Sequence, residues 1–284
     1  MVPIKMARQV SQTQINDLDN DCLSLVFRQF TLQNMIRLRI VCKRWRSMIE
    51  LICQGKTSLQ LFALKKDACC YLQFAKRCNI HDYNDVNSFE LSSNKLILSG
   101  PSLELSLFLP SIFPNVRKLI YRCKLDLVPL LKSWTNLEFL CLYMQNCEEH
   151  EKIRAYSIIN SILTLKRLHL FVYGRVILEN MPILARLERF SLNYYFGNIV
   201  SILAQLGPPI RRLYLDYIPC DLGQLRQLVQ MQPEFGTNLT HLIVVNIRSN
   251  QSSVQDRKQF LQLICNNFLA LTHLDVTFTN QVRK

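Results

Sequence analysis

The stretch Leu165-Lys166-Arg167-Leu168-His169-Leu170 decides the fold of this 284-residue chain, because its pattern recurs along the second half of the sequence. In this pattern of six residues, the first, fourth and sixth positions are apolar. Alternation of this kind predicts a β-strand with one buried face. The pattern occurs seven times, at Val116–Tyr121, Leu137–Leu142, Leu165–Leu170, Leu187–Leu192, Ile210–Leu215, Leu239–Val244 and Leu271–Val276.

The segments between these strands have helical spacing. Apolar residues recur at three and four positions within 158–163, 199–206 and 260–268, which predicts helices. A single strand and helix cannot bury their apolar faces alone, so neighbouring units must stack into a solenoid with parallel strands on its concave side. The predicted fold class is therefore α/β.

The repeats start 21 to 32 residues apart, about 26 on average, where leucine-rich repeats span roughly 20–29. Residues 85–284 thus resemble leucine-rich-repeat proteins. One position differs from that family. The Asn or Cys expected three residues after the last leucine is replaced by Gln145, Tyr173, Tyr195 and Ile218.

The first 55 residues follow a different pattern. Leu23, Val26, Phe27 and Phe30 form a stripe with helical spacing, preceded by residues that commonly cap helices, such as Asp19. Thr31 is a second candidate cap. Apolar residues then continue at helical spacing to about residue 53, which predicts two or three short helices.

The stretches Leu18–Phe30 and Val41-Cys42-Lys43-Arg44-Trp45 resemble the F-box family. The resemblance implies that residues 15–54 dock a Skp-family adaptor and, through it, a cullin scaffold. Asp19 stands where family members usually carry proline. The adaptor-binding residues implied by the resemblance are Leu18, Leu23, Phe27, Phe30, Met35, Val41 and Cys42. The alternative is that these side chains pack inward or against the first repeat, as we expect of Trp45.

We therefore expect an N-terminal tail at 1–14, an F-box-like helical module at 15–55, a linker with irregular early repeats at 56–110, and a leucine-rich-repeat solenoid at 111–284. Short strands are candidates at Leu59–Leu61, Phe89–Leu91 and Leu96–Leu98. Only eight residues follow the last strand pattern. Either 277–284 folds over the end of the sheet, or a partner covers it, or the solenoid is truncated.

The composition restricts the class of protein. No run of apolar residues is long enough to span a bilayer, and the start lacks the apolar core of a signal peptide. The eleven cysteines show no regular framework. We expect a protein of the cytoplasm or nucleus with reduced thiols. No zinc-type cysteine pair, phosphate loop or nucleophile elbow occurs, so we expect no catalysis, metal or cofactor.

Aligning the predicted strands gives a basic row, because Lys118, Phe139, Arg167, Arg189, Arg212, His241 and His273 occupy equivalent positions. The substrate-binding hypothesis combines three of these arginines, Arg167, Arg189 and Arg212, with the nearby rings of Tyr143, Phe171 and Tyr214. Such a surface suits an acidic or phosphorylated protein segment. The alternative is that these arginines only face water on the concave side and bind no substrate.

Taken together, the two sections predict the substrate-recognition subunit of a Skp-cullin-F-box ubiquitin ligase, which positions a protein for ubiquitination and proteasomal degradation. Two other functions stay open. The net charge of +13 also suits a basic solenoid that binds nucleic acid. An F-box-like scaffold that acts outside any ligase is the other alternative.

Overall fold

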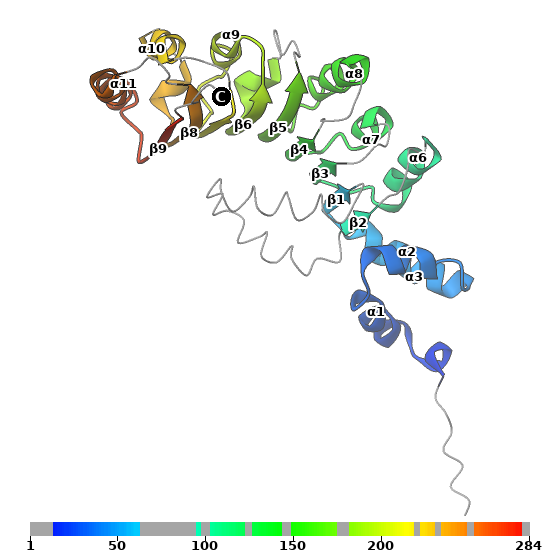
Figure 1. Ribbon diagram of the computed structural model, residues 1–284. Coiled ribbons are helices and arrows are strands. Elements are labelled where there is room, and N and C mark those ends of the chain that lie inside the picture. Colours follow the sequence, from blue (N-terminus) through cyan, green and yellow to red (C-terminus); the bar gives the residue numbers. More distant parts are fainter. Residues whose placement is uncertain are drawn as a thin grey trace, which may run out of the picture.

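The computed structural model describes residues 14–62, 95–97, 103–122, 127–143, 149–174, 182–218, 222–230, 234–248 and 253–279. Figure 1 shows a curved row of strands with helices along its outer side, and a group of helices beyond one end of the row. The fold is therefore a short helical module followed by a parallel-strand solenoid of the leucine-rich-repeat type, as the repeating pattern predicts.

Side-chain caps set the starts of the three N-terminal helices. A short turn, η1 (Ile15–Asp17), precedes α1 (Asn20–Arg28), α2 (Leu32–Leu38) and α3 (Lys43–Gln54). The Cys22 amide donates to Asp19 Oδ1 at 2.7 Å, and the Asn34 amide donates to Thr31 Oγ1 at 3.3 Å. The predicted capping roles of Asp19 and Thr31 are confirmed.

The solenoid strands are β1 (Ser58–Phe62), β2 (Lys95–Ile97), β3 (Lys118–Arg122), β4 (Phe139–Tyr143), β5 (Arg167–Gly174), β6 (Arg189–Tyr195), β7 (Arg212–Asp216), β8 (His241–Arg248) and β9 (His273–Thr279). In the described residues they form one sheet in the order β2-β1-β3-β4-β5-β6-β7-β8-β9. Every pairing between neighbours is parallel. All seven repeats of the strand pattern lie at β3 to β9.

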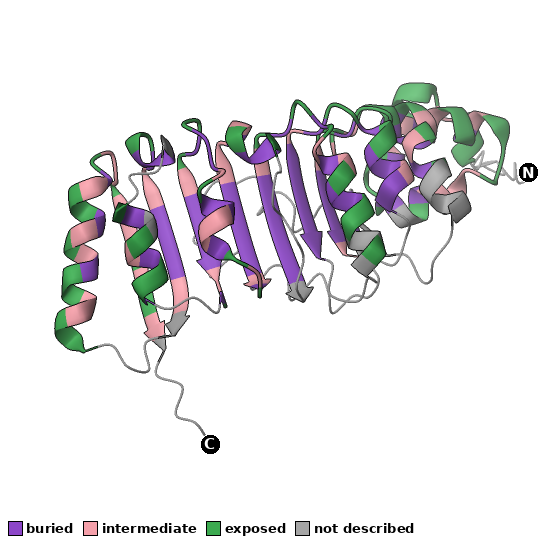
Figure 2. Cartoon of the chain, turned by 90° about the horizontal axis from the view of Figure 1, so that it is seen from above, coloured by how far each residue is buried: buried purple, intermediate pink, exposed green. Residues whose placement is uncertain are grey.

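The helices follow the strands they cover. They are α6 (Leu103–Ile112), α7 (Leu127–Ser133), α8 (Glu149–Ile159), α9 (Ile199–Leu203), α10 (Leu222–Gln230) and α11 (Val254–Asn267), with shorter turns η3 (Pro182–Arg186) and η4 (Glu234–Thr237). They lie along the outer side of the curve (Figure 1). Burial is concentrated along the middles of the strands, and the helices expose their outward faces (Figure 2). The opposite side of the sheet is the concave face.

The sheet begins earlier than the expected start of the solenoid at residue 111. β1 pairs with β3 over Ser58 to Phe62, so it is continuous with the regular repeats. β2 lies at the outer edge, paired with β1. The candidate strands at Leu59–Leu61 and Leu96–Leu98 therefore correspond to β1 and, in part, to β2. The candidate at Phe89–Leu91 lies outside the described residues.

Left-handed backbone recurs at equivalent positions of three successive repeats, within β6, directly after β7 and within β8. Tyr194, Tyr217 and Asn246 have φ values of 56, 50 and 64°. Each lies two residues after the last apolar position of its repeat. The next residue then turns back into the core, where Tyr195 and Ile218 are buried. Apolar contact thus replaces the hydrogen-bonding Asn ladder expected of the family at these positions.

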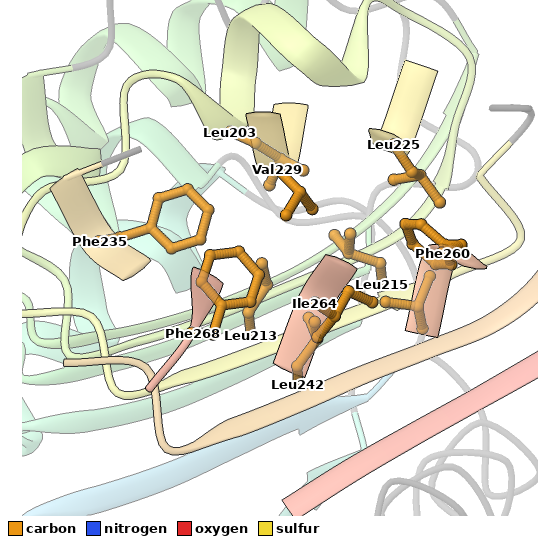
Figure 3. A pocket seen from close by; sticks show the side chains of 11 residues that line it. Leu203, Leu213, Leu215, Leu225, Val229, Phe235, Leu242, Phe260, Ile264 and Phe268 are labelled. Atoms are coloured by element: carbon orange, nitrogen blue, oxygen red, sulfur yellow. The ribbon is translucent and has the colours of Figure 1, made fainter. Parts of the chain in front are cut away.

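The core between the sheet and the last helices contains a small apolar cavity of about 20 Å³. Its walls are side chains of β7 and β8, together with α10, α11 and η4, among them Leu225, Val229, Phe260 and Phe268 (Figure 3). The cavity has no polar lining. It is an imperfection in the packing between neighbouring repeats.

Candidate functional site

The N-terminal module buries three of the side chains that the family resemblance assigns to the adaptor. Leu23, Phe27 and Met35 have no exposed surface. Phe27 packs edge to face on Trp45, with ring centroids 5.1 Å apart. In this structure the three side chains pack inward, which is the alternative to direct adaptor contact. A module this small needs its largest apolar side chains for its own core.

The other assigned residues lie at the surface. Phe30 is 37% and Val41 54% exposed, Cys42 is exposed and Leu18 is half-buried. Val41 and Cys42 belong to the turn after α2, and the Cys42 sulfur accepts a hydrogen bond from the Trp45 amide at 3.4 Å.

The same turn carries Ile40, which is 84% exposed and was not among the predicted contact residues. It lies outside the helical stripe that guided the prediction. The sequence signal for this contact residue was a large apolar side chain outside the stripe, next to a second one at Val41.

Two residues of the Val41–Trp45 motif hold the first turn of the module. The Arg44 guanidinium donates to the Asn16 carbonyl at 2.7 Å and to Asn20 Oδ1 at 3.1 Å, and it also donates to the Leu18 carbonyl. Trp45 Nε1 donates to Asn16 Oδ1 at 3.1 Å. The inward packing expected of Trp45 is confirmed, and the motif fixes the segment around residues 16–20.

The module is joined closely to the solenoid. Three residues separate α3 from β1, and the Thr57 carbonyl accepts hydrogen bonds from the amides of Arg117 and Lys118 at the start of β3. Arg39 pairs with Glu50 of α3, and its guanidinium lies 5.0 Å from the Phe108 ring centroid on α6. The two parts therefore share one continuous packing surface.

The concave face has the row alignment that the sequence predicts. Arg167 is in register with Arg189, and Arg189 with Arg212. The row continues through His241 and His273, whose rings stack with centroids 5.4 Å apart. The three arginines are each partly exposed. Three guanidinium groups on adjacent strands make this part of the face cationic.

Aromatic rings lie on the arginine-bearing strands β5 and β7 and on the neighbouring strand β4. Tyr143 and Phe171, in register on β4 and β5, stack with centroids 3.8 Å apart and planes 7° apart. On β7 the Tyr214 hydroxyl donates to Asp216 Oδ2 at 3.2 Å. The predicted site residues are thus brought to one face, but the two aromatic groups lie on either side of β6 and do not form a single platform.

Between the aromatic groups lies a set of buried polar side chains, His169, Ser191 and Asn193, which we call the polar floor. His169 is 6% exposed, and Ser191 and Asn193 are 1% exposed. Asn193 Nδ2 donates to Ser191 Oγ at 3.3 Å. The sequence prediction included none of these three. The sequence signal for them was polar residues at outward strand positions, where neighbouring strands carry aromatic residues.

Burial controls the charge of the polar floor. Burial, and then the positive charges of Arg167 and Arg189, lower the pKa of His169 to about 3. The imidazole is therefore neutral near pH 7. The positive charge of this face comes from the arginines, and the floor beneath them is polar but uncharged.

Comparison with protein-family models identifies the N-terminal module. Residues 15–53 match the F-box domain. The F-box thus covers the three capped helices and ends within α3. No curated protein matches the chain.

Solved structures with a similar fold include two internalins of Listeria monocytogenes strain 4b F2365. Internalin C2 has 21% identity and a TM-score of 0.36, over 59% of this chain and 73% of its own. Internalin InlF has 18% identity and a TM-score of 0.38, over 66% of this chain and 46% of its own. The chain therefore spans less than half the length of the second.

The described residues hold no group of three or more His, Cys, Asp or Glu side chains placed to bind a metal ion. Their helices include none with the length and apolar character to cross a membrane. The cysteines that the structure describes, at positions 22, 42, 53, 141 and 265, form no disulfide.

Proposed function

We propose that this chain is the substrate receptor of a Skp-cullin-F-box ubiquitin ligase, acting in the cytoplasm or nucleus. The F-box domain at residues 15–53 carries the proposal. Such a receptor binds an adaptor with one part and a substrate with another, and it performs no covalent step itself. The joined helical module and solenoid suit that division.

The adaptor side of the proposal is supported by apolar surface on the F-box. Ile40, Val41 and Phe30 expose large side chains next to the helices that the buried core holds in place. Exposed apolar groups of this kind gain free energy when a partner removes them from water. We assign the adaptor contact to the turns after α1 and α2, with Leu18 and Cys42 at its margins.

The substrate side is supported by the concave face. Arg167, Arg189 and Arg212 lie on adjacent strands, which places them ~4.8 Å apart along the row. Guanidinium groups form strong, charge-assisted hydrogen bonds with carboxylates and phosphates. An acidic or phosphorylated protein segment lying across the strands could meet all three. The Tyr143–Phe171 stack and Tyr214 keep 7–9% of their surface exposed, and only this exposed part would contact its apolar side chains.

Affinity purification followed by mass spectrometry tests both sides in cells. The full chain should recover a Skp-type adaptor and a cullin. A double change, Arg189→Glu and Arg212→Glu, should remove substrate proteins and leave the adaptor bound. The control is Lys132→Glu with Lys258→Glu, which makes the same charge change at exposed positions of α7 and α11 on the outer helices.

Three results would contradict the proposal. Absence of adaptor and cullin from the wild-type sample would contradict the ligase role. Equal substrate recovery by the two double variants would contradict the arginine site. Retention of single-stranded nucleic acid, with a steep salt dependence and loss on reversing the two arginines, would favour a nucleic-acid-binding solenoid instead.

A further inference from the structure

Two buried polar atoms of the concave face lack a hydrogen-bond partner among the residues that the structure describes. They are Nδ1 of His169 on β5 and Oδ1 of Asn193 on the adjacent strand β6. Their residues are 6% and 1% exposed. Because the residues alternate with Leu168, Leu170 and Leu192 of the core, both side chains face the concave side.

An unsatisfied buried polar atom is destabilising, so native structures rarely keep one without a reason. Leucine branches at the same atom as asparagine and would leave no polar atom unsatisfied at position 193. The polar residue at that position therefore suggests a partner that arrives with a ligand.

The existing hydrogen bond defines what Asn193 lacks. Its Nδ2 donates to Ser191 Oγ at 3.3 Å, so the outstanding atom is the carbonyl-type Oδ1. Such an oxygen can only accept. The complementary ligand group must donate a hydrogen bond.

His169 sets a second condition. Its neutral ring can either accept or donate at Nδ1, depending on the tautomer. A hydroxyl or a primary amide on the ligand satisfies both orphan atoms, because each of these groups can donate and accept. An ammonium or guanidinium group also donates, but the positive charges of Arg167 and Arg189 oppose it.

The strand register places other side chains beside the polar floor. Phe171 on β5 and Asp216 on β7 are the partners of Asn193. Tyr214 on β7 is the partner of Ser191. A ligand side chain at the floor would therefore lie next to two rings and a carboxylate.

The arginine row lies close to the floor. Arg167 is two residues before His169 on β5, which is ~7 Å along the strand, and Arg189 is four residues before Asn193 on β6, which is ~13 Å. Two to four residues of an extended peptide cover these distances. A ligand residue on the arginines and another on the floor would thus be near neighbours in sequence.

We propose that the concave face recognises an acidic or phosphorylated residue together with a nearby Ser, Thr, Asn or Gln, whose side chain hydrogen-bonds to Asn193 and His169. This rests on the proposed function, because the arginine row must capture the acidic residue. It adds a second specificity: an apolar side chain at the floor leaves both orphan atoms unsatisfied.

A positional peptide library tests the inference on the immobilised full-length chain. Each peptide carries a fixed Asp or phosphoserine, and the four positions on either side are varied. At one of those positions we expect enrichment of Ser, Thr, Asn or Gln over Ala, Val and Leu, by roughly 5- to 150-fold, the range that one unsatisfied buried group implies.

The change Asn193→Leu should remove this enrichment and shift the preference toward apolar residues, with selection for the acidic residue unchanged. This variant should fold, because leucine has the same branching and number of side-chain heavy atoms as asparagine, and only the 3.3 Å hydrogen bond to Ser191 Oγ is lost. Thermal unfolding followed by circular dichroism checks that. Asn266→Leu, at an exposed position of α11, is the matched control and should behave as wild type.

The outcomes separate the two proposals. If acidic and phosphorylated peptides bind but the neighbouring positions show no preference, the inference is overturned and the arginine site stands. An unchanged preference in folded Asn193→Leu overturns it as well. If the library gives no binding that Arg189→Glu with Arg212→Glu abolishes, the arginine site and the inference both fail.

Discussion

Replacing Ile40 and Val41 by serine tests the assignment of the adaptor contact. Complete burial of such a side chain contributes roughly 1.5–3 kcal/mol. Ile40 is 84% and Val41 54% exposed, so both retain surface for a partner to bury. In proportion to that surface, the double change should weaken adaptor binding by about 2–4 kcal/mol, which is about 30- to 700-fold in Kd.

Isothermal titration calorimetry with a purified Skp-type adaptor measures the effect directly. The free energy of unfolding should change by less than about 0.5 kcal/mol, because both side chains lie at the surface. Leu23→Ala is the contrasting variant. Its side chain is fully buried, so we expect a loss of about 2–5 kcal/mol in stability, and weaker binding only where the module has unfolded.

Two results would refute this reasoning. Unchanged adaptor affinity in the double serine variant would show that the turn after α2 is not the contact. A folded Leu23→Ala protein with strongly reduced affinity would show that the buried residues meet the adaptor after all. In that case the module would have to open when it binds.

Three more predictions concern stability and pH. Phe260→Ala should lower the free energy of unfolding by about 3–5 kcal/mol in urea titrations, because the ring is buried beside an existing cavity of about 20 Å³; a loss below about 1 kcal/mol would mean that the repeats collapse around the gap. Because the pKa of His169 falls from 6.5 to about 3 on folding, the unfolded chain binds a proton that the folded chain does not as the pH drops below 6.5. Stability should then fall by up to about 1.4 kcal/mol per pH unit more in wild type than in His169→Gln, and parallel pH profiles would contradict the burial argument. Asp19→Pro should keep α1, since Asp19 has φ of −64° and the preceding Leu18 is extended. The hydrogen bond from the Cys22 amide lowers the pKa of Asp19, so the charged carboxylate stabilises α1 near neutral pH and loses this effect when it is protonated in acid. The proline variant has no such carboxylate, so its helical circular dichroism should fall less in acid than that of wild type. Equal losses in the two proteins would argue against the cap.

Much of the fold could be predicted from local pattern. Seven copies of one strand pattern, with helical spacing between them, predicted the parallel sheet, the side that the helices cover and the alignment of Arg167, Arg189 and Arg212. Caps at Asp19 and Thr31 were equally local. These features depend on residues within one or two repeats of each other, so periodicity is enough to find them.

The candidate site could be predicted only in part. Family resemblance pointed to the module that matches the F-box domain, but it did not separate buried Leu23, Phe27 and Met35 from exposed Ile40 and Val41. An amphipathic stripe shows which residues share a helix face, and it does not show what covers that face. The packing of three helices around Trp45 settles that question.

The sequence by itself determined the repeat, the order of the two sections and the row of cationic side chains, because each follows from spacing along the chain. Only the tertiary structure decided that β1 joins the sheet beside β3, and that His169, Ser191 and Asn193 form a buried floor between aromatic neighbours. Burial and hydrogen-bond satisfaction depend on side chains from several strands at once. A linear pattern carries no measure of how neighbouring strands enclose one another.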